Sequence, residues 1–274
     1  MRPTVLHALA GAAAAALAAL AAPAAALADP VGMVVLKEHA VGNTVQAQGF
    51  LDQLLAIAAQ QNGWPGVKGQ FHTQRANAEA YIKSDSPQYG ILSLAPFLAF
   101  RGTYNLEPIG QAFVTGGGGG LQYFLVSKTA SDLAGCKGKS LASDHIDDQR
   151  FIEKVVSGGQ FKLAEFTLDK TTRPMQGIKK VADDQAVCAL IDDAQLANAA
   201  AAGLKQVWQS AKLPPMVVVA FPGASAADRK TFQSNMGKLC QGAGSQTCAQ
   251  VGLKELAAAG PADYAAVIAA YNAP

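Results

Sequence analysis

Short apolar stretches alternate with segments of helical periodicity along most of the chain. Residues 31–36 form an apolar run, and the helix expected after it ends at Asn62-Gly63, before Pro65. The same alternation predicts strands at 67–73, 89–94, 106–114 and 121–127, with a helix at 75–83. Strands and helices that alternate in this way are typical of parallel sheets with helices on their faces.

The pattern starts again after Thr129. It predicts strands at 139–142, 161–168, 186–191, 205–208 and 216–221, and helices at 147–156, 173–181 and 194–202. The remaining segments, with Val251, Leu253 and Leu256, are expected to be helical. The sequence therefore predicts an α/β fold of two lobes, each with a mainly parallel sheet flanked by helices.

Two crossings are expected to join the lobes, because the chain leaves the first series near Ser127 and returns to it around Pro214 and Pro215. Residues 29–127 with 213–274 are assigned to lobe 1, and residues 128–212 to lobe 2. The stretch from Leu141 to Phe151 is a strand-to-helix junction of lobe 2, with Asp147 as the expected N-cap. Such junctions lie at the carboxyl ends of strands, so we expect this one to contact a ligand in the crevice between the lobes.

The first 28 residues are typical of a secretory signal peptide. Arg2 precedes a run of almost only Ala and Leu from Ala8 to Ala22, and Ala26-Leu27-Ala28 is a small-x-small cleavage signal. We expect residues 1–28 to be removed on export, with no stable membrane insertion afterwards. An uncleaved membrane anchor is the alternative.

Charge and cysteine content narrow the functional classes. The 22 basic and 20 acidic residues give a net charge of +2, with no basic run, so nucleic acid is not an expected partner.

Export places the four cysteines in an oxidising compartment. We favour the pairs Cys240–Cys248 and Cys136–Cys188 among the three possible pairings. A metal site is the alternative, although the sequence has no C-x-x-C pair.

Three histidines follow or end predicted strands, and they could form a metal or cation site. His39, His72 and His145 could all face the crevice, with Glu38, Asp144 or Asp147 as neighbours. The alternative is that they are unrelated loop histidines, because no H-x-H or H-x-x-x-H pair connects them. The sequence shows no catalytic motif such as G-x-S-x-G, and it predicts no cofactor.

Five consecutive glycines, 116–120, lie between two predicted strands. They predict either a flexible tip or hinge, or a loop whose backbone amides approach a ligand. No Gly-Lys-Ser/Thr follows, so this is not a phosphate-binding loop of the nucleotide-binding type.

Three segments carry a resemblance to a known family. A "DLKGK"-like entry to a second lobe is found at Asp132-Leu133-Ala134-Gly135 with Lys137-Gly138-Lys139-Ser140. The segment 186–194 is similar to the family's "aDaavvdd" strand. The segment 208–215 is similar to the crossing by which the chain returns to the first lobe. In this order they resemble the phosphate/phosphonate-binding proteins of ABC transporters. The resemblance implies a periplasmic-binding-protein fold of type 2 and a monomer that is not an enzyme. It also implies capture of a small oxyanion between the lobes and delivery to an ABC transporter permease.

Many members of that family carry a Ser/Thr-rich segment where this chain has Ser143-Asp144-His145. The alternatives are a metal-dependent periplasmic enzyme or cation-binding protein, and a sensor or accessory domain without a transporter. The expected ligand-binding residues are Lys37, His39, Ser93, Thr115, Gly116, Ser143, Asp144, His145, Thr171, Thr172 and Asp192.

Overall fold

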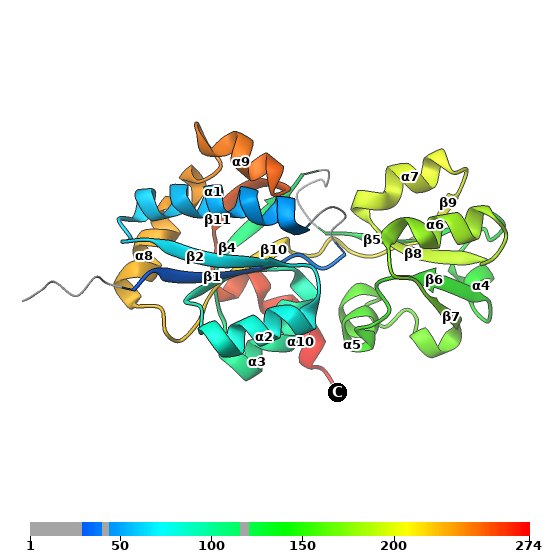
Figure 1. Ribbon diagram of the computed structural model, residues 1–274. Helices are drawn as coiled ribbons and strands as arrows, with labels where there is room; N and C mark the ends of the chain where they lie inside the picture. Colours follow the sequence, from blue (N-terminus) through cyan, green and yellow to red (C-terminus); the bar gives the residue numbers. More distant parts are fainter. Residues whose placement is uncertain (1–28, 40–43, 116–120) are drawn as a thin grey trace, which may run out of the picture.

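The computed structural model describes residues 29–39, 44–115 and 121–274 and consists of two α/β lobes side by side (Figure 1). The expected signal peptide and Gly116 lie outside the described residues. Within the described part, no helix has both the length and the apolar character that are needed to cross a membrane.

Lobe 1 is built on a six-stranded sheet with the order β11-β4-β10-β3-β1-β2. Its strands are β1 (Val31–Leu36), β2 (Val67–His72), β3 (Tyr89–Leu92), β4 (Glu107–Val114), β10 (Met216–Ala220) and β11 (Leu253–Ala258). Its helices are α1 (Thr44–Asn62), α2 (Arg75–Asp85), α3 (Leu94–Tyr104), α8 (Ala226–Asn235), α9 (Gly244–Gln250) and α10 (Ala265–Asn272), with the 3₁₀ turns η4 (Met236–Lys238) and η5 (Pro261–Tyr264).

The helices of lobe 1 cover both faces of its sheet (Figure 1). On one face, Leu51, Leu54 and Leu55 of α1 pack with Phe232 of α8 and Cys248 of α9. On the other face, residues of α2, α3 and α10 form a second core with the sheet. This second core continues into lobe 2 through Tyr123, Phe151 and Val155, so apolar burial contributes to holding the lobes together.

Lobe 2 has a five-stranded sheet with the order β7-β6-β8-β5-β9. Its strands are β5 (Tyr123–Ser127), β6 (Ser140–Ser143), β7 (Thr167–Lys170), β8 (Cys188–Asp192) and β9 (Lys205–Gln209). Its helical segments are α4 (Leu133–Cys136), α5 (Gln149–Phe151), the π-helical η1 (Ile152–Val156), η2 (Leu163–Glu165), α6 (Pro174–Ala182), η3 (Asp193–Gln195) and α7 (Leu196–Ala201).

The expected α/β architecture is confirmed, but both sheets are mixed rather than mainly parallel. β1 pairs in parallel with β2 and β3, and β6 with β7 and β8. The antiparallel pairs involve β5 in lobe 2, and β10 and β11 in lobe 1. β5 and β10 are the strands by which the chain enters each lobe from the other, which is why they run against their neighbours.

The two crossings lie against each other. One leads from β4 to β5 and the other from β9 to β10, and Leu213 N–H donates to Leu121 O over 2.8 Å. β5 belongs to the sheet of lobe 2, so the first crossing precedes Tyr123, whereas the boundary expected at residue 127 falls at the end of that strand.

Three segments differ from the sequence-based expectation. The prediction of a helix around Leu253 and Leu256 is wrong, because residues 253–258 form the edge strand β11 against β4. The helix α3 was not predicted, and residues 161–168 contain the turn η2 before a short strand instead of one long strand. Both expected disulfides, Cys136–Cys188 and Cys240–Cys248, are present.

Candidate functional site

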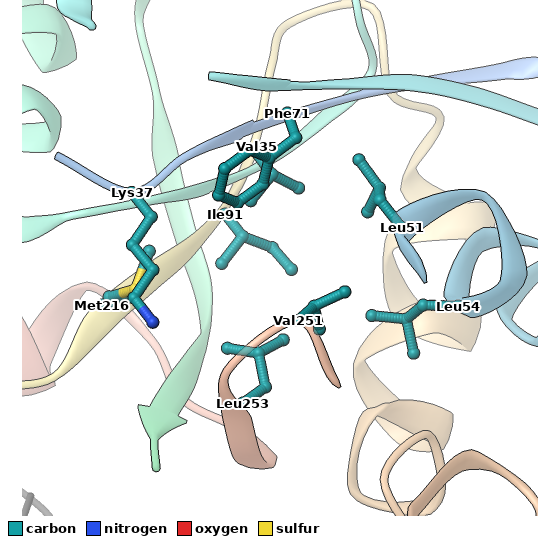
Figure 2. A pocket seen from close by; sticks show the side chains of 9 residues that line it. All are labelled: Val35, Lys37, Leu51, Leu54, Phe71, Ile91, Met216, Val251 and Leu253. Carbon is teal, nitrogen blue, oxygen red and sulfur yellow. The ribbon is translucent and has the colours of Figure 1, made fainter. Parts of the chain in front are cut away.

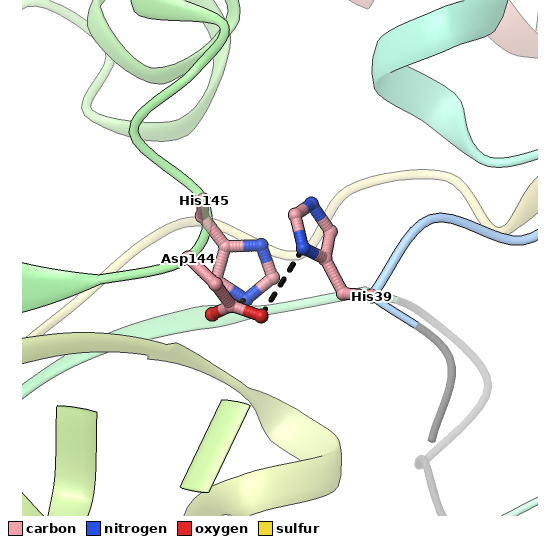
Figure 3. A group of neighbouring side chains, drawn as sticks. All are labelled: His39, Asp144 and His145. Carbon is pink, nitrogen blue, oxygen red and sulfur yellow. Dashed lines mark hydrogen bonds and ion pairs between the residues drawn. The ribbon is translucent and has the colours of Figure 1, made fainter. Parts of the chain in front are cut away.

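Two strand ends from different lobes meet at the junction between the lobes. His39 lies just beyond β1 in lobe 1, and Asp144 and His145 directly follow β6 in lobe 2. His39 Nδ1 and Asp144 Oδ2 are 3.1 Å apart, and the two imidazole rings have their centroids 4.2 Å apart (Figure 3). We call His39, Asp144 and His145 the junction cluster. Its side chains offer ligand atoms that all lie within 4.8 Å of one another.

His39 has a left-handed backbone conformation, with φ of 60°. This region is uncommon for a residue with a Cβ atom, and it costs on the order of 1 kcal/mol. The preceding residue is held in place, because Ser93 Oγ accepts a 3.1 Å hydrogen bond from Glu38 N–H and Ser93 N–H donates to Leu36 O. The end of β3 thus fixes the chain that carries His39 toward lobe 2.

Ser143 fixes the other half of the junction cluster. Its hydroxyl is buried, donates to Leu190 O over 2.7 Å, and accepts a 3.0 Å hydrogen bond from His145 N–H. This contact between the ends of β6 and β8 turns the chain so that Asp144 and His145 are both buried, each with 6% of its surface exposed. Ser143 therefore has a structural role that positions its two neighbours.

The His145 ring is enclosed by groups from three elements. Its Nε2 atom lies 3.7 Å from Asp144 Oδ1 and 3.8 Å from Asp192 Oδ2 at the end of β8, and Tyr123 of β5 packs against the ring edge-on. Both distances exceed hydrogen-bond length, and within the described residues Nε2 has no hydrogen-bond partner. A buried polar atom of this kind costs roughly 1–3 kcal/mol.

Burial and neighbouring charges set the protonation of these groups. Burial, helped by the charge of His39, lowers the pKa of His145 to about 3, so its imidazole is neutral at pH 7. Burial of His39 lowers its pKa as well, but the hydrogen bond and charge of Asp144 outweigh this, and the pKa of His39 is raised. Burial raises the pKa of Asp144, yet the two imidazoles outweigh it and lower that pKa. The pKa of Asp192 is raised, first by burial and then by the Asp144 charge.

An ion-pair network lies next to the junction cluster. Arg75 at the start of α2 donates to Glu38 Oε1 over 2.9 Å and to Glu38 Oε2 over 3.0 Å. It also donates over 2.9 Å to Asp148 Oδ2 in lobe 2. Burial lowers the pKa of Arg75, but the two carboxylates outweigh it and raise that pKa. Arg75 therefore connects the lobes and neutralises carboxylates beside the site.

From the sequence, no role in the site is predicted for Arg75 or Asp148. Asp147, which we expected to cap the helix, is exposed and pairs with Lys170. The N-cap of α5 is Asp148, whose carboxylate accepts a 2.9 Å hydrogen bond from Phe151 N–H. An aspartate directly before an apolar helical run is the sequence signal for an N-cap, and Asp148 fits it as well as Asp147 does. Nothing in the sequence indicates that Asp148 pairs with Arg75.

Lys37 and Thr115 lie together at Gly252 in lobe 1, and the charge of Asp192 acts on the Lys37 ammonium. Lys37 Nζ points toward Gly252 O at 3.5 Å, and Thr115 N–H donates to the same carbonyl over 3.1 Å. Lys37 lines a small cavity of about 10 Å³ with apolar side chains, among them Phe71, Met216 and Leu253 (Figure 2). That volume holds about one water molecule, so the cavity does not accommodate a larger solute.

Thr171 and Thr172 lie in lobe 2 beside a surface hollow. Thr171 N–H donates to Ser143 O, and Thr172 N–H and Oγ1 both donate to Gln176 Oε1. The hollow, about 350 Å³ in volume, is lined by these two threonines and by Gln176, Gln185, Lys170, Lys179 and Lys180. Each of the three lysines forms an ion pair with an aspartate. Both hydroxyls thus have protein partners, because Thr171 Oγ1 is 3.5 Å from Arg173 O.

Of the three histidines considered for a metal site, the structure brings His39 and His145 together and leaves His72 elsewhere. His72 ends β2, and its ring packs against Tyr81 with 5.7 Å between centroids. Among the expected ligand-binding residues, His39, Asp144, His145 and Asp192 converge, with Ser93 and Ser143 supporting them through backbone contacts.

Comparison with known proteins gives matches in structure only, because no protein-family model and no curated protein match the chain. A binding-protein component of an ABC phosphonate transporter from Pseudomonas aeruginosa has a TM-score of 0.64 at 15% identity, with 87% of this chain and 84% of that chain covered. PhnD1 from Prochlorococcus marinus, in complex with methylphosphonate, has a TM-score of 0.63 at 10% identity, with 87% and 96% covered. A Xanthomonas citri protein bound to chloride has a TM-score of 0.69 at 7% identity, with 88% and 96% covered.

These matches extend over most of both chains, but their sequence identities are too low to transfer a ligand. The chain therefore has the two-lobed α/β fold of periplasmic binding proteins such as these phosphonate-binding components.

Proposed function

We propose that this protein is an exported solute-binding protein, which captures a small solute between its lobes and delivers it to an ABC transporter permease. The observation that carries the proposal is the junction cluster, in which the half-buried His39 beyond β1 meets the buried Asp144 and His145 beyond β6 across the two lobes. A solute bound at this point contacts both lobes and so favours their closed arrangement.

The contacts between the lobes support a hinge function. The lobes are joined by only two chain crossings in the described structure, and side-chain contacts such as His39–Asp144 and Arg75–Asp148 also bridge them. Arg150 of lobe 2 adds hydrogen bonds to Tyr271 O and Ala273 O near the end of α10. Such polar contacts can form and break as the lobes close and open, and opening would also expose part of the apolar core that the lobes share.

The likeness of fold also supports the proposal. The structural neighbours include binding components for phosphonate and a putative sulfonate-binding protein, the latter with a TM-score of 0.53 at 14% identity. For this chain, export depends on the expected signal peptide at residues 1–28, and the membrane partner on the resemblance described above. An exported binding protein that acts without catalysis is consistent with all of these features.

Two ligand classes deserve testing. The resemblance implies a phosphate, phosphite or phosphonate ligand. At the junction cluster, however, such an anion would meet the carboxylates of Asp144 and Asp192, which repel negative charge, whereas a cation would be attracted. Beside His145, these two carboxylates therefore favour a cationic solute.

A test should measure binding and closure separately. The mature protein would be screened with phosphate, phosphite, methylphosphonate, a sulfonate and divalent cations by thermal shift, since a ligand of the folded state raises the melting temperature. Small-angle X-ray scattering with and without each hit would then report lobe closure as a smaller radius of gyration. A protein whose scattering does not respond to any stabilising solute would contradict the proposed function.

A further inference from the structure

We propose, building on the solute-binding function above, that the captured solute is a divalent transition-metal ion of the zinc type. His39 of lobe 1 and Asp144 and His145 of lobe 2 would bind the ion. Metal binding would then join the lobes directly, because removal of either lobe leaves an incomplete set of ligands.

The distances within the junction cluster fit shared coordination. His145 Nε2 lies 3.7 Å from Asp144 Oδ1 and 3.8 Å from Asp192 Oδ2. Two ligand atoms bound about 2.1 Å from a tetrahedral zinc ion lie roughly 3.4 Å apart. The observed separations are too long for hydrogen bonds and need only small side-chain movements to reach this value. Asp192 is thus placed to act as a fourth ligand.

A buried atom without a partner points into this space. His145 is 94% buried, given its 6% exposure, and within the described part of the chain its Nε2 atom accepts or donates no hydrogen bond. Asp192 Oδ1 likewise has no partner among the described residues. A metal ion between these two side chains would satisfy both, whereas a simple structural histidine would be expected to have a hydrogen-bond partner.

The chemistry of the donor atoms selects the class of metal. Neutral imidazole and carboxylate groups together suit zinc and its neighbours in the first transition series, whereas calcium and magnesium prefer oxygen ligands alone. The carboxylates of Asp144 and Asp192, both close to His145 Nε2, balance the charge of a divalent ion. On binding, the ion would replace the hydrogen bond between His39 and Asp144.

The left-handed backbone at His39 allows a substitution that removes the imidazole and keeps the local backbone conformation. Asn tolerates the left-handed conformation better than most residues, so His39→Asn removes the imidazole while keeping the turn. His145→Gln tests the buried ligand, and His72→Gln is the matched control because His72 lies against Tyr81, outside the junction cluster.

The experiment uses the mature chain with both disulfides, freed of metal by a chelator. Zn²⁺ alone is titrated by calorimetry, and Co²⁺ is added separately because its visible absorption reports tetrahedral coordination. We expect one ion per chain in the wild type, an affinity at least about tenfold weaker in His39→Asn, and no change in His72→Gln. Circular dichroism checks that each variant is folded, and His39→Asn decides the result if His145→Gln does not fold.

Scattering with Zn²⁺ then shows whether the ion closes the lobes. Absence of zinc binding, or wild-type affinity in folded His39→Asn, would overturn the metal proposal, as would zinc binding that leaves the radius of gyration unchanged. If methylphosphonate or phosphate closes the lobes and zinc does not, the metal proposal fails while the solute-binding function stands. If no solute closes the lobes, both fail.

Discussion

Arg75 of lobe 1 donates a 2.9 Å hydrogen bond to Asp148 of lobe 2, and Asp148 is at the same time the N-cap of α5. The Asp148 carboxylate therefore caps the N-terminus of a helix in lobe 2 and also pairs with Arg75 of lobe 1. The Arg75 side chain keeps 29% of its surface exposed, against 11% for Asp148, so water can reach the pair when the lobes move. We call the Arg75–Asp148 ion pair the latch, because it connects the two lobes beside the junction cluster.

Replacing Arg75 by methionine should open the latch. The variant leaves Glu38 and Asp148 as partly buried carboxylates without their cation, and we expect a loss of about 1–3 kcal/mol in the free energy of unfolding. Urea denaturation measures this loss, and scattering of the folded variant should show a larger radius of gyration. The control is Lys83→Met, which removes an exposed ion pair to Glu79 and should lower the free energy of unfolding much less. Equal effects of the two substitutions would argue against a latch.

The two disulfides should contribute unequally to stability. Cys136 and Cys188 are 52 residues apart, whereas Cys240 and Cys248 are only 8 apart. Because a longer closed loop restricts the unfolded chain more, replacing the first pair by alanine should cost about 4 kcal/mol and the second about 2.5 kcal/mol. Chemical denaturation of the two double variants checks the order. A larger loss from the 240–248 pair would contradict it.

Much of the fold could be predicted from periodicity, because most strands are short apolar runs. The exceptions have tertiary causes. α3 begins at Leu94, at the end of the apolar run 89–94 that predicts a strand, and it contains Pro96 because proline is tolerated in the first turn of a helix. Residues 253–258 have apolar residues at a spacing that also suits a helix, and only the free edge of β4 selects a strand.

The site was predictable where its residues follow strands. His39, Asp144, His145 and Asp192 all lie at or just beyond strand ends, and strand ends of one lobe face those of the other. Sequence position could not tell that His72, at the end of β2, lies apart from them. It also could not pair Arg75 with Asp148, because that contact joins residues far apart in the chain and depends on how the two lobes dock.

The metal-free protein should lose stability in acid because of His145. Its pKa is about 3 in the folded state, mainly through burial, whereas an unfolded histidine titrates near its ordinary value of 6.5. Below pH 6.5 the unfolded chain therefore binds a proton that the folded chain does not, and the free energy of unfolding falls as pH decreases toward 3. Urea midpoints between pH 7.5 and 4 test this. In a folded His145→Gln variant the decline should be shallower, and an identical slope would contradict the assignment.

Replacing Lys37 by methionine separates a structural lysine from a ligand-binding one. Its ammonium is directed at Gly252 O beside apolar side chains, and burial lowers its pKa despite the charge of Asp192 (Figure 2). At pH 7 the charged form is disfavoured in the folded state, so Lys37→Met should stabilise the protein by about 1 kcal/mol. This gain should shrink as pH rises through the lowered pKa toward 10.5, because the folded lysine then becomes neutral. Denaturation at pH 7 and pH 10 measures both effects, and calorimetry should show that zinc affinity is not weakened. A weaker affinity for zinc or any other captured solute would assign Lys37 to the binding site instead.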